Sequence, residues 1–289
     1  MSKVLVLYNS ELDYGVFKKQ YESYVSAFSE LGICAEAMPT SALPSVLSTT
    51  DSPFLDADAI IYLDKDLYCA NLLESQGLKL YNSSDCIRIC DDKALTYLAL
   101  CQKGIPIPKT VTAPKTYSSC QSEQWCDKAS ALLGYPLIIK ECFGSLGKQV
   151  YLANNRTEML QKVKEIGTRP FVFQEFLPDG AGWDIRVLVA GGEVIGAIKR
   201  SNENDFRSNA ALGGSVEPYE LSSDMAELAI SATNAVGAFF AGVDLILGSN
   251  GFMVCEVNSN MLFEAADNSL GISTASIIAQ KIKKHSLNK

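Results

Sequence analysis

The sequence predicts an α/β protein: a small layer with a parallel sheet, followed by α+β subdomains. Two observations support this prediction. Near the N-terminus, apolar segments at residues 3–7, 33–37 and 59–63 alternate with a helical pattern over residues 16–31, which is typical of parallel strands joined by helices. From residue 137 onward, short apolar segments follow one another across glycine-rich turns, which is typical of antiparallel hairpins.

The composition is that of an ordinary globular protein. The 289 residues are 47% hydrophobic and 20% charged, and no apolar run approaches the ~20 residues that cross a bilayer. The first ten residues, MSKVLVLYNS, lack the long apolar core of a signal peptide, so we expect a cytoplasmic protein with no membrane partner. The formal net charge of −8 argues against nucleic acid as a partner.

Cysteine and histidine usage limits the possible chemistry. The nine cysteines are scattered without a C-x-x-C pair, which favours free thiols. The single histidine, His285, lies in a basic C-terminal segment, KIKKHSLNK. Mechanisms that need a Ser-His-Asp or Cys-His arrangement are therefore excluded from further consideration.

A helix is predicted to begin at Asp91-Asp92-Lys93, with Leu95, Leu98, Ala99 and Cys101 facing inward. Gly104, Pro106 and Pro108 end it. The pattern of the chain changes near Ser84, so we place a domain boundary just before this helix. A polar loop over residues 114–124 then leads into a helix that ends at Gly134.

A glycine-rich loop joins two predicted strands, residues 137–140 and 150–152. Its sequence is GSLGK, from Gly144 to Lys148, and Gln149 follows where a Walker A loop would need Ser or Thr at the start of a helix. Glycines let backbone N–H groups approach an anion, and Lys140 and Lys148 add positive charge. A phosphate-binding hairpin loop and an ordinary hairpin tip are both compatible with this segment taken alone.

The chain then continues as strands and helices in alternation. We predict a helix over residues 157–165, a strand over 171–176, and a hairpin from residues 184–190 and 193–200 that turns at Gly191-Gly192. On the first hairpin strand, Asp184 and Arg186 share a face with Leu188. Helices are predicted over residues 223–237 and 272–284.

The hairpin over residues 242–260 carries the most informative acidic side chains. If residues 249–251 form a three-residue loop, Gly248 pairs with Phe252 and Asp244 lies opposite Glu256. Asn258, two residues beyond Glu256, faces the same way. Two carboxylates and an amide oxygen suit a hard cation such as Mg²⁺. A half-exposed polar hairpin is the alternative, because a slip of one residue would separate the three groups.

The order of these motifs resembles the ATP-grasp superfamily, and most closely the RimK-type α-L-glutamate ligases. The series consists of Lys93 at a helix start, GIPIP, a strand ending at Lys140, GSLGK, QEF, DIRVLVAGGEV, DFRSN, and AGVDL followed by CEVN. The resemblance runs from about Ser84 to the C-terminus. It implies an N-terminal Rossmann-like pre-ATP-grasp domain over residues 1–83. It also implies a central ATP-grasp subdomain over residues 84–172 and a C-terminal subdomain with the metal site over residues 173–289.

The resemblance also implies roles for individual residues. Those expected to contact ATP are Lys93, Lys140, Ser145, Gly147 and Lys148 at the phosphates, Glu175 and Phe176 at adenine, and Asp184 near the ribose. Arg207, of DFRSN, and Lys140 would act on the phosphoryl group that is transferred. The expected ligands of Mg²⁺ or Mn²⁺ are Asp244, Glu256 and Asn258. The expected substrate-binding residues are Arg186, Arg200 and Asn260.

The implied chemistry is carboxylate activation. ATP would phosphorylate a carboxylate, and an amine from an amino acid or peptide would then displace phosphate to give an amide and ADP. Such phosphoryl transfer needs positioning and charge neutralisation more than a protein nucleophile. Two alternatives stay open: a nucleotide-binding regulatory protein that has lost its acceptor chemistry, and a ligase that forms an ester. The oligomeric state also stays open, with a homo-oligomer among the alternatives.

Two segments depart from the family pattern. RimK-type ligases have EVN-x-SPG after the metal-binding strand, whereas this chain has EVNSN followed by Met261, so we expect residues 259–263 to follow a different path and to line an altered acceptor pocket. The H-x-G-G that follows FRSN in the family is replaced here by residues 210–214, AALGG.

Overall fold

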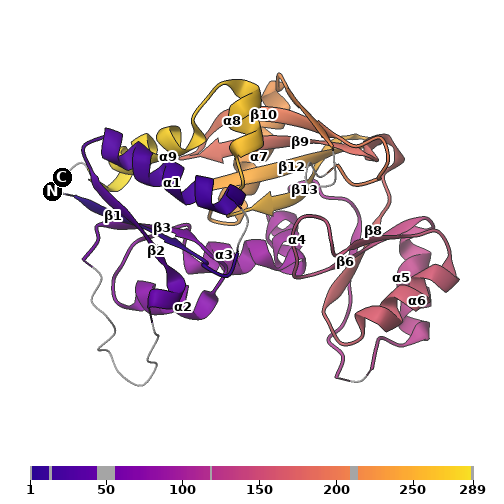
Figure 1. The fold of residues 1–289 in the computed structure, drawn as a ribbon. Helices are drawn as coiled ribbons and strands as arrows, with labels where there is room; N and C mark the ends of the chain where they lie inside the picture. The colour runs from indigo at the N-terminus through magenta and orange to yellow at the C-terminus, as the bar shows by residue number, and fades with distance from the viewer. Residues whose placement is uncertain (1, 13–14, 44–55, 118, 209–213, 288–289) are drawn as a thin grey trace.

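The computed structural model describes residues 2–12, 15–43, 56–117, 119–208 and 214–287. These residues form three sheets with helices packed on them (Figure 1). Within the described ranges, every helix is too short or too polar to cross a membrane.

The first sheet is parallel, as predicted. Its strands are β1 (Lys3–Tyr8), β2 (Cys34–Pro39), β3 (Ala59–Leu63) and β4 (Leu80–Tyr81), in the order β2-β1-β3-β4. Helix α1 (Gly15–Glu30) connects β1 to β2, a 3₁₀ turn at Thr40–Ala42 follows β2, and α2 (Leu67–Ser75) connects β3 to β4. All five residues of β3 are buried, as expected for a parallel strand covered on both faces.

The second sheet forms a separate layer with α5 (Glu123–Leu133) and α6 (Arg156–Ile166), at the lower right of Figure 1. Its strands are β5 (Thr110–Thr112), β6 (Leu137–Glu141), β7 (Val150–Ala153) and β8 (Phe171–Glu175), in the antiparallel order β5-β8-β6-β7. The predicted domain boundary at residues 172–173 was wrong, because it cuts β8. Since β8 pairs along its whole length with β6, we place the boundary after Glu175.

The third sheet is antiparallel, with the order β11-β10-β9-β12-β13. Its strands are β9 (Trp183–Ala190), β10 (Glu193–Ser201), β11 (Ser215–Pro218), β12 (Phe240–Gly248) and β13 (Gly251–Asn258), and a 3₁₀ turn at Pro178–Gly180 precedes β9. The predicted hairpin at Gly191-Gly192 is confirmed. Helix α7 (Ser223–Ala235) packs on one face of the sheet, and α8 (Glu264–Leu270) and α9 (Thr274–Ile282) lie on the other, followed by a π-helical turn at Lys283–Leu287.

The first and third sheets share one hydrophobic core, although they lie at opposite ends of the sequence. Helices α1 and α9 fill the space between them (Figure 1). Tyr24 and Phe28 of α1 contact the same cluster as Phe240 of β12 and Ile278 of α9. The N-terminal layer therefore packs directly on the C-terminal part of the chain.

Two helices precede the second sheet: α3 (Ser84–Asp91) and α4 (Lys93–Gln102). The predicted helix start is confirmed, because the Asp92 carboxylate caps α4 by accepting from two backbone N–H groups. The predicted inward face was wrong at two positions, because Leu98 is 53% exposed and Cys101 is exposed. Ala99 packs against the core as predicted. The buried residues are Lys93, Thr96, Tyr97 and Leu100, so the buried face of this helix mixes polar and apolar side chains.

The β12–β13 hairpin places Asp244 opposite Glu256, as predicted, but by a different route. The turn has two residues, so Gly248 pairs with Gly251 and not with Phe252. A β-bulge then inserts Cys255, because Leu245 pairs with Val254 while Asp244 pairs with Glu256. The shorter turn and the extra residue compensate each other.

Candidate active site

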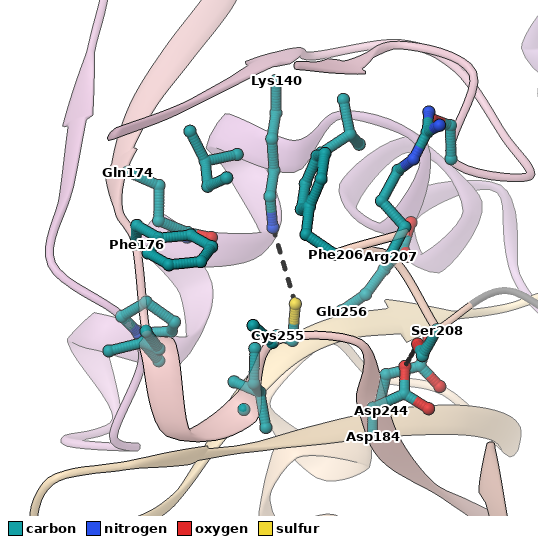
Figure 2. A pocket seen from close by; sticks show the side chains of 18 of the residues that line it. Lys140, Gln174, Phe176, Asp184, Phe206, Arg207, Ser208, Asp244, Cys255 and Glu256 are labelled. Carbon is teal, nitrogen blue, oxygen red and sulfur yellow. Dashed lines mark hydrogen bonds between the residues drawn. The ribbon is translucent and has the colours of Figure 1, made fainter. Parts of the chain in front are cut away.

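A cavity lies between the second and third sheets (Figure 2). Its lining includes ten of the predicted residues: Lys93, Lys140, Ser145, Gly147, Glu175, Phe176, Asp184, Arg207, Asp244 and Glu256.

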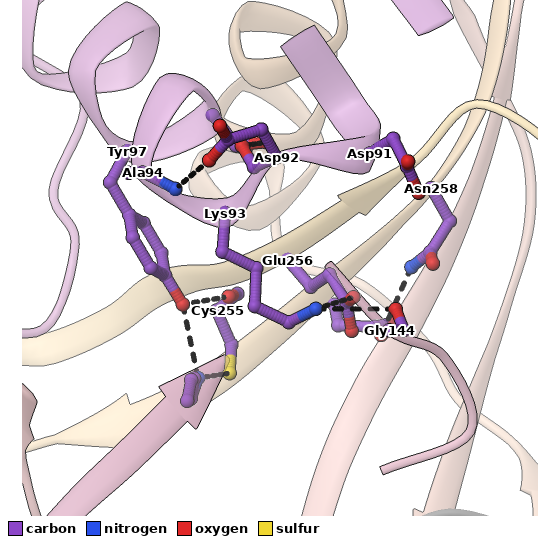
Figure 3. Close-up of polar contacts among 12 residues, drawn as sticks. Asp91, Asp92, Lys93, Ala94, Tyr97, Gly144, Cys255, Glu256 and Asn258 are labelled. Carbon is purple, nitrogen blue, oxygen red and sulfur yellow. Dashed lines mark hydrogen bonds and ion pairs between the residues drawn. The ribbon is translucent and has the colours of Figure 1, made fainter. Parts of the chain in front are cut away.

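Two lysines bring positive charge to this cavity from different elements. Lys93 begins α4, and its Nζ lies 3.3 Å from the carbonyl oxygen of Gly144 and 3.8 Å from Glu256 Oε1 (Figure 3). Lys140 lies in β6 and is 7% exposed; its Nζ donates to the hydroxyl of Tyr97 at 3.0 Å. Both ammonium groups are thus held beside the glycine-rich loop and the β13 bulge.

The protonation of Lys140 follows from its surroundings. Burial alone would lower its pKa, but the polar neighbours Cys255, Tyr97 and Glu256 outweigh burial and raise the pKa. Lys140 is therefore a buried cation, which suits it to an anionic ligand.

The glycine-rich loop connects β6 to β7, as predicted. Leu146 and Gly147 have positive φ values of 58° and 71°, so the loop turns sharply at its tip. Arg207 binds this turn, because its Nη1 donates to the carbonyl oxygen of Gly147 at 2.7 Å. Its other nitrogens bind Asp205, at 2.9 and 2.6 Å. Lys148 is exposed and is not among the residues that line the cavity, and its phosphate contact stays a prediction.

A row of charged side chains crosses the third sheet at the cavity wall. Cross-strand pairing sets Arg200 beside Asp184, Arg186 beside Asp244, and Asp244 beside Glu256. Arg186 binds both Asp244 oxygens at 2.7 Å, and Arg200 binds the Asp184 oxygens at 2.7 and 2.5 Å. Arg200 also lies 3.1 Å from Asp244, which joins the two pairs into one network.

Burial and charge act differently on the two carboxylates. Burial raises the pKa of Asp184, although Arg200 opposes the rise. For Asp244, burial also favours the neutral acid, but Arg186 and Arg200 outweigh it and lower the pKa. Asp244 is therefore the firmly ionised member of the network.

The predicted metal ligands lie at one edge of this row. Glu256 reaches the cavity, and the Asn258 amide lies 3.4 Å from Asp244 Oδ2. Among the residues that the structure describes, no three His, Cys, Asp or Glu side chains form a metal cluster. Two carboxylates and an amide are still a suitable oxygen set for Mg²⁺. Glu256 and Asn258 are the most available of the three, since arginines occupy both Asp244 oxygens.

The opposite end of the cavity is apolar and has a polar rim. Phe176 lies beside Gln174 in Figure 2. Glu175 accepts a hydrogen bond from the backbone N–H of Lys109 at 2.6 Å, which fixes the end of β8. This combination suits a flat heteroaromatic ring.

Asn260 and Met261 point away from the cavity. The Asn260 amide donates to the carbonyl oxygen of Leu63 and accepts from Gln20, both in the N-terminal layer. Met261 is 1% exposed in the shared core, so the expectation that residues 259–263 line an acceptor pocket was wrong for Met261. The altered segment 210–214 lies outside the described residues except for Gly214.

The predicted substrate arginines are engaged elsewhere. Arg200 is 6% exposed inside the network, and neither it nor Arg186 lines the cavity.

Sequence reasoning missed three residues that shape the site: Tyr97, Ser208 and Cys255. Ser208 donates to Asp184 at 2.5 Å, and Tyr97 contacts both Lys140 and Cys255. One signal was available for Tyr97, because it lies four residues after Lys93 and so shares its helix face.

Comparisons with known proteins agree with this geometry. The family model for the RimK-like ATP-grasp domain matches residues 90–282. A probable α-L-glutamate ligase of Legionella pneumophila is 34% identical over 216 residues, covering 73% of this chain and 69% of that protein. Human N-acetylaspartylglutamate synthase A is 34% identical over 220 residues, covering 75% of this chain. The chain spans only 55% of that synthase's length.

A solved structure shows the same fold. The RimK-domain ATP-grasp protein from Sphaerobacter thermophilus superposes with a TM-score of 0.75 at 21% sequence identity, covering 96% of this chain and 98% of the other. The fold is therefore an ATP-grasp fold, as the motif order predicted. With its family model matching about two thirds of its length, this chain belongs to the RimK-like ATP-grasp family of ligases.

Proposed function

We propose that this protein is an ATP-dependent carboxylate–amine ligase that works through an acyl phosphate. The observation that carries the proposal is the convergence of Lys93, Lys140 and Arg207, from three separate segments, on one cavity that also holds Glu256. Three cations around one cavity suit a polyphosphate, and phosphoryl transfer relies on such charge neutralisation.

The proposed reaction has two steps. A carboxylate oxygen attacks the γ-phosphorus of ATP, the bond from that phosphorus to the β–γ bridging oxygen breaks, and ADP leaves. An amine nitrogen then attacks the acyl carbon; the C–N bond forms, phosphate leaves, and the nitrogen loses a proton. Lys140 and Lys93 would hold the phosphates, and Arg207 would stabilise the charge on the transferred group.

Other residues would orient the nucleotide. Phe176 and the end of β8 at Glu175 would hold adenine, and Asp184 would lie near the ribose. Glu256, Asn258 and Asp244 would hold Mg²⁺, which would neutralise negative charge on the phosphates. The proposed amine is glutamate or a related amino acid, because the names of two relatives in the same family contain glutamate.

The test measures ADP release. Purified protein is given Mg-ATP, glutamate, and a panel of carboxylates that includes N-acetylated amino acids and peptides. We expect ADP with at least one pair, a product whose mass is the sum of acid and amine minus water, and a loss of at least about 100-fold in rate for Glu256→Gln. Glu217→Gln is the matched control, because Glu217 forms an exposed ion pair with Lys199 away from the cavity.

The outcomes separate the alternatives. Tight binding of Mg-ATP without ADP release for any pair would contradict the ligase and favour a nucleotide-binding protein. A product that mild base hydrolyses would identify an ester.

A further inference from the structure

Tyr97 connects three parts of the cavity through one hydroxyl group. It lies on α4, four residues after Lys93, and is 4% exposed. Its hydroxyl accepts a hydrogen bond from Lys140 Nζ at 3.0 Å and donates one to the carbonyl oxygen of Cys255 at 2.8 Å (Figure 3). One phenol therefore links α4, β6 and β13.

The contact to Cys255 falls on the β-bulge. The register of β13 skips Cys255, and the extra residue of a bulge has no partner residue across the ladder. The Tyr97 hydroxyl supplies a hydrogen bond to the carbonyl oxygen of this extra residue. This bulge is also what brings Glu256 opposite Asp244.

The contact to Lys140 fixes a buried cation. The Lys140 side chain has many rotamers. Among the residues that the structure describes, its ammonium group has the Tyr97 hydroxyl at 3.0 Å and Cys255 Sγ at 3.5 Å at hydrogen-bond distance. The sulfur is a weak acceptor, so the phenol is the stronger of the two. A phenol has one donor and free lone pairs, so both contacts of Tyr97 form at once.

We infer that Tyr97 is a positioning residue, which sets the Lys140 ammonium and the Cys255 bulge so that Lys140 meets the nucleotide phosphates while Glu256 stays opposite Asp244. This inference rests on the proposed function, since it assumes that Lys140 binds phosphate. Tyr97 is not among the residues that line the cavity, so we expect it to act through Lys140 and Cys255.

The test compares phosphate binding with nucleoside binding in Tyr97→Phe. This change removes the hydroxyl and keeps the ring, so the fold is retained. We expect affinity for ATP and ADP, measured by calorimetry, to fall about fivefold to tenfold, while affinity for adenosine stays unchanged. We also expect the KM for ATP to rise without change in the KM for the amine.

Tyr62→Phe is the matched control. Tyr62 is 2% exposed, and its hydroxyl donates to a backbone carbonyl, that of Asp66, at 2.7 Å in the N-terminal layer. The Tyr62→Phe variant loses the same kind of hydrogen bond, so its ATP affinity shows the effect of reduced stability alone. We expect its affinity for ATP to match that of the wild-type chain.

Three results would overturn the inference. Equal losses of ATP and adenosine affinity in Tyr97→Phe, or equal losses of ATP affinity in both variants, would show a purely structural role. Unchanged ATP affinity in Tyr97→Phe would refute the inference and leave the proposed function standing. Failure of the wild-type chain to bind ATP would refute both.

Discussion

Arg200 shows how one buried residue can hold a charged network together. Its guanidinium lies between Asp184 and Asp244, and all three side chains are buried. Buried charges are tolerated only where they are paired, because an isolated ion in a protein interior costs several kcal/mol. Arg200 is thus a buried residue whose guanidinium is held by ion pairs with two carboxylates.

We expect Arg200→Met to lower the free energy of unfolding by about 3 kcal/mol, because Asp184 would stay buried without its main counter-charge. Denaturant unfolding measures this change. The neighbouring Lys199→Met is the control: its ion pair with Glu217 is partly exposed, so a change under about 1 kcal/mol is expected. Similar losses of unfolding free energy in Arg200→Met and Lys199→Met would contradict the assignment of Arg200 as the main counter-charge of Asp184.

The same variant has an expected pH dependence. Burial raises the pKa of Asp184 in the wild-type protein, and removal of Arg200 would raise it further. A carboxyl group whose pKa is raised by folding stabilises the folded state at low pH and loses that contribution as the pH rises through the raised pKa. The deficit of Arg200→Met should therefore be smaller at about pH 5 than at about pH 8.

At the scale of elements, one carboxylate at the end of β6 connects neighbouring segments of the second sheet. Glu141 accepts hydrogen bonds from Arg169, which precedes β8, at 2.5 Å and from Tyr151 of β7 at 2.9 Å. Burial alone would raise the pKa of Glu141, but these two donors outweigh burial and lower it. The carboxylate thus links the three strands that end beside the glycine-rich loop.

We expect Glu141→Gln to destabilise this sheet by about 1–3 kcal/mol at neutral pH, because the charged hydrogen bond to Arg169 is lost. A carboxylate whose pKa is lowered by folding stabilises the protein above its unfolded-state value, here 4.5, and loses that contribution as the pH falls through the folded value. The difference between variant and wild type should therefore shrink below pH 4.5. Hydrogen exchange of the backbone amides in β6, β7 and β8 measures this stability difference locally. A stability difference that does not change with pH would contradict the prediction.

At the scale of the molecule, the N-terminal layer is tied to the third sheet by buried polar contacts as well as by the shared core. Asn82 is 1% exposed; its amide donates to the carbonyl oxygens of Phe240 and Ser259 at 2.8 Å and accepts from the N–H of Phe239 at 2.7 Å. Gln20 donates to Asn260 and to the Met261 carbonyl. The segment that follows β13 is therefore held by the N-terminal layer.

Met261→Ala tests this arrangement. We expect it to lower the free energy of unfolding by about 2–5 kcal/mol, because it empties a site in the shared core, and to leave acceptor preference unchanged. Leu262→Ala is the control, since Leu262 is only partly buried and should cost less. A shift in acceptor preference with unchanged stability would show that Met261 lines the acceptor pocket after all.

The sequence by itself determined the family, the parallel N-terminal sheet, the two hairpins of the third sheet and most of the candidate residues that line the cavity. These depend on local signals: apolar periodicity, glycine turns, the Asp92 cap, and motifs in a fixed order along the chain. The parallel N-terminal sheet and the pairing of Asp244 with Glu256 were predicted in this way. The pairing of Asp244 with Glu256 was predicted correctly only because two changes in strand register offset each other: the shorter turn, and the extra residue at the Cys255 bulge.

Only the tertiary structure decided which polar side chains face which neighbours. Tyr97 and Lys140 are far apart in sequence, and their contact depends on how α4 packs against β6 and β13. The same holds for Asn260 and Met261, which a sequence motif assigned to an acceptor pocket and which the fold places against the N-terminal layer. Sequence patterns report the face of a single element, whereas these contacts depend on the packing of elements against each other.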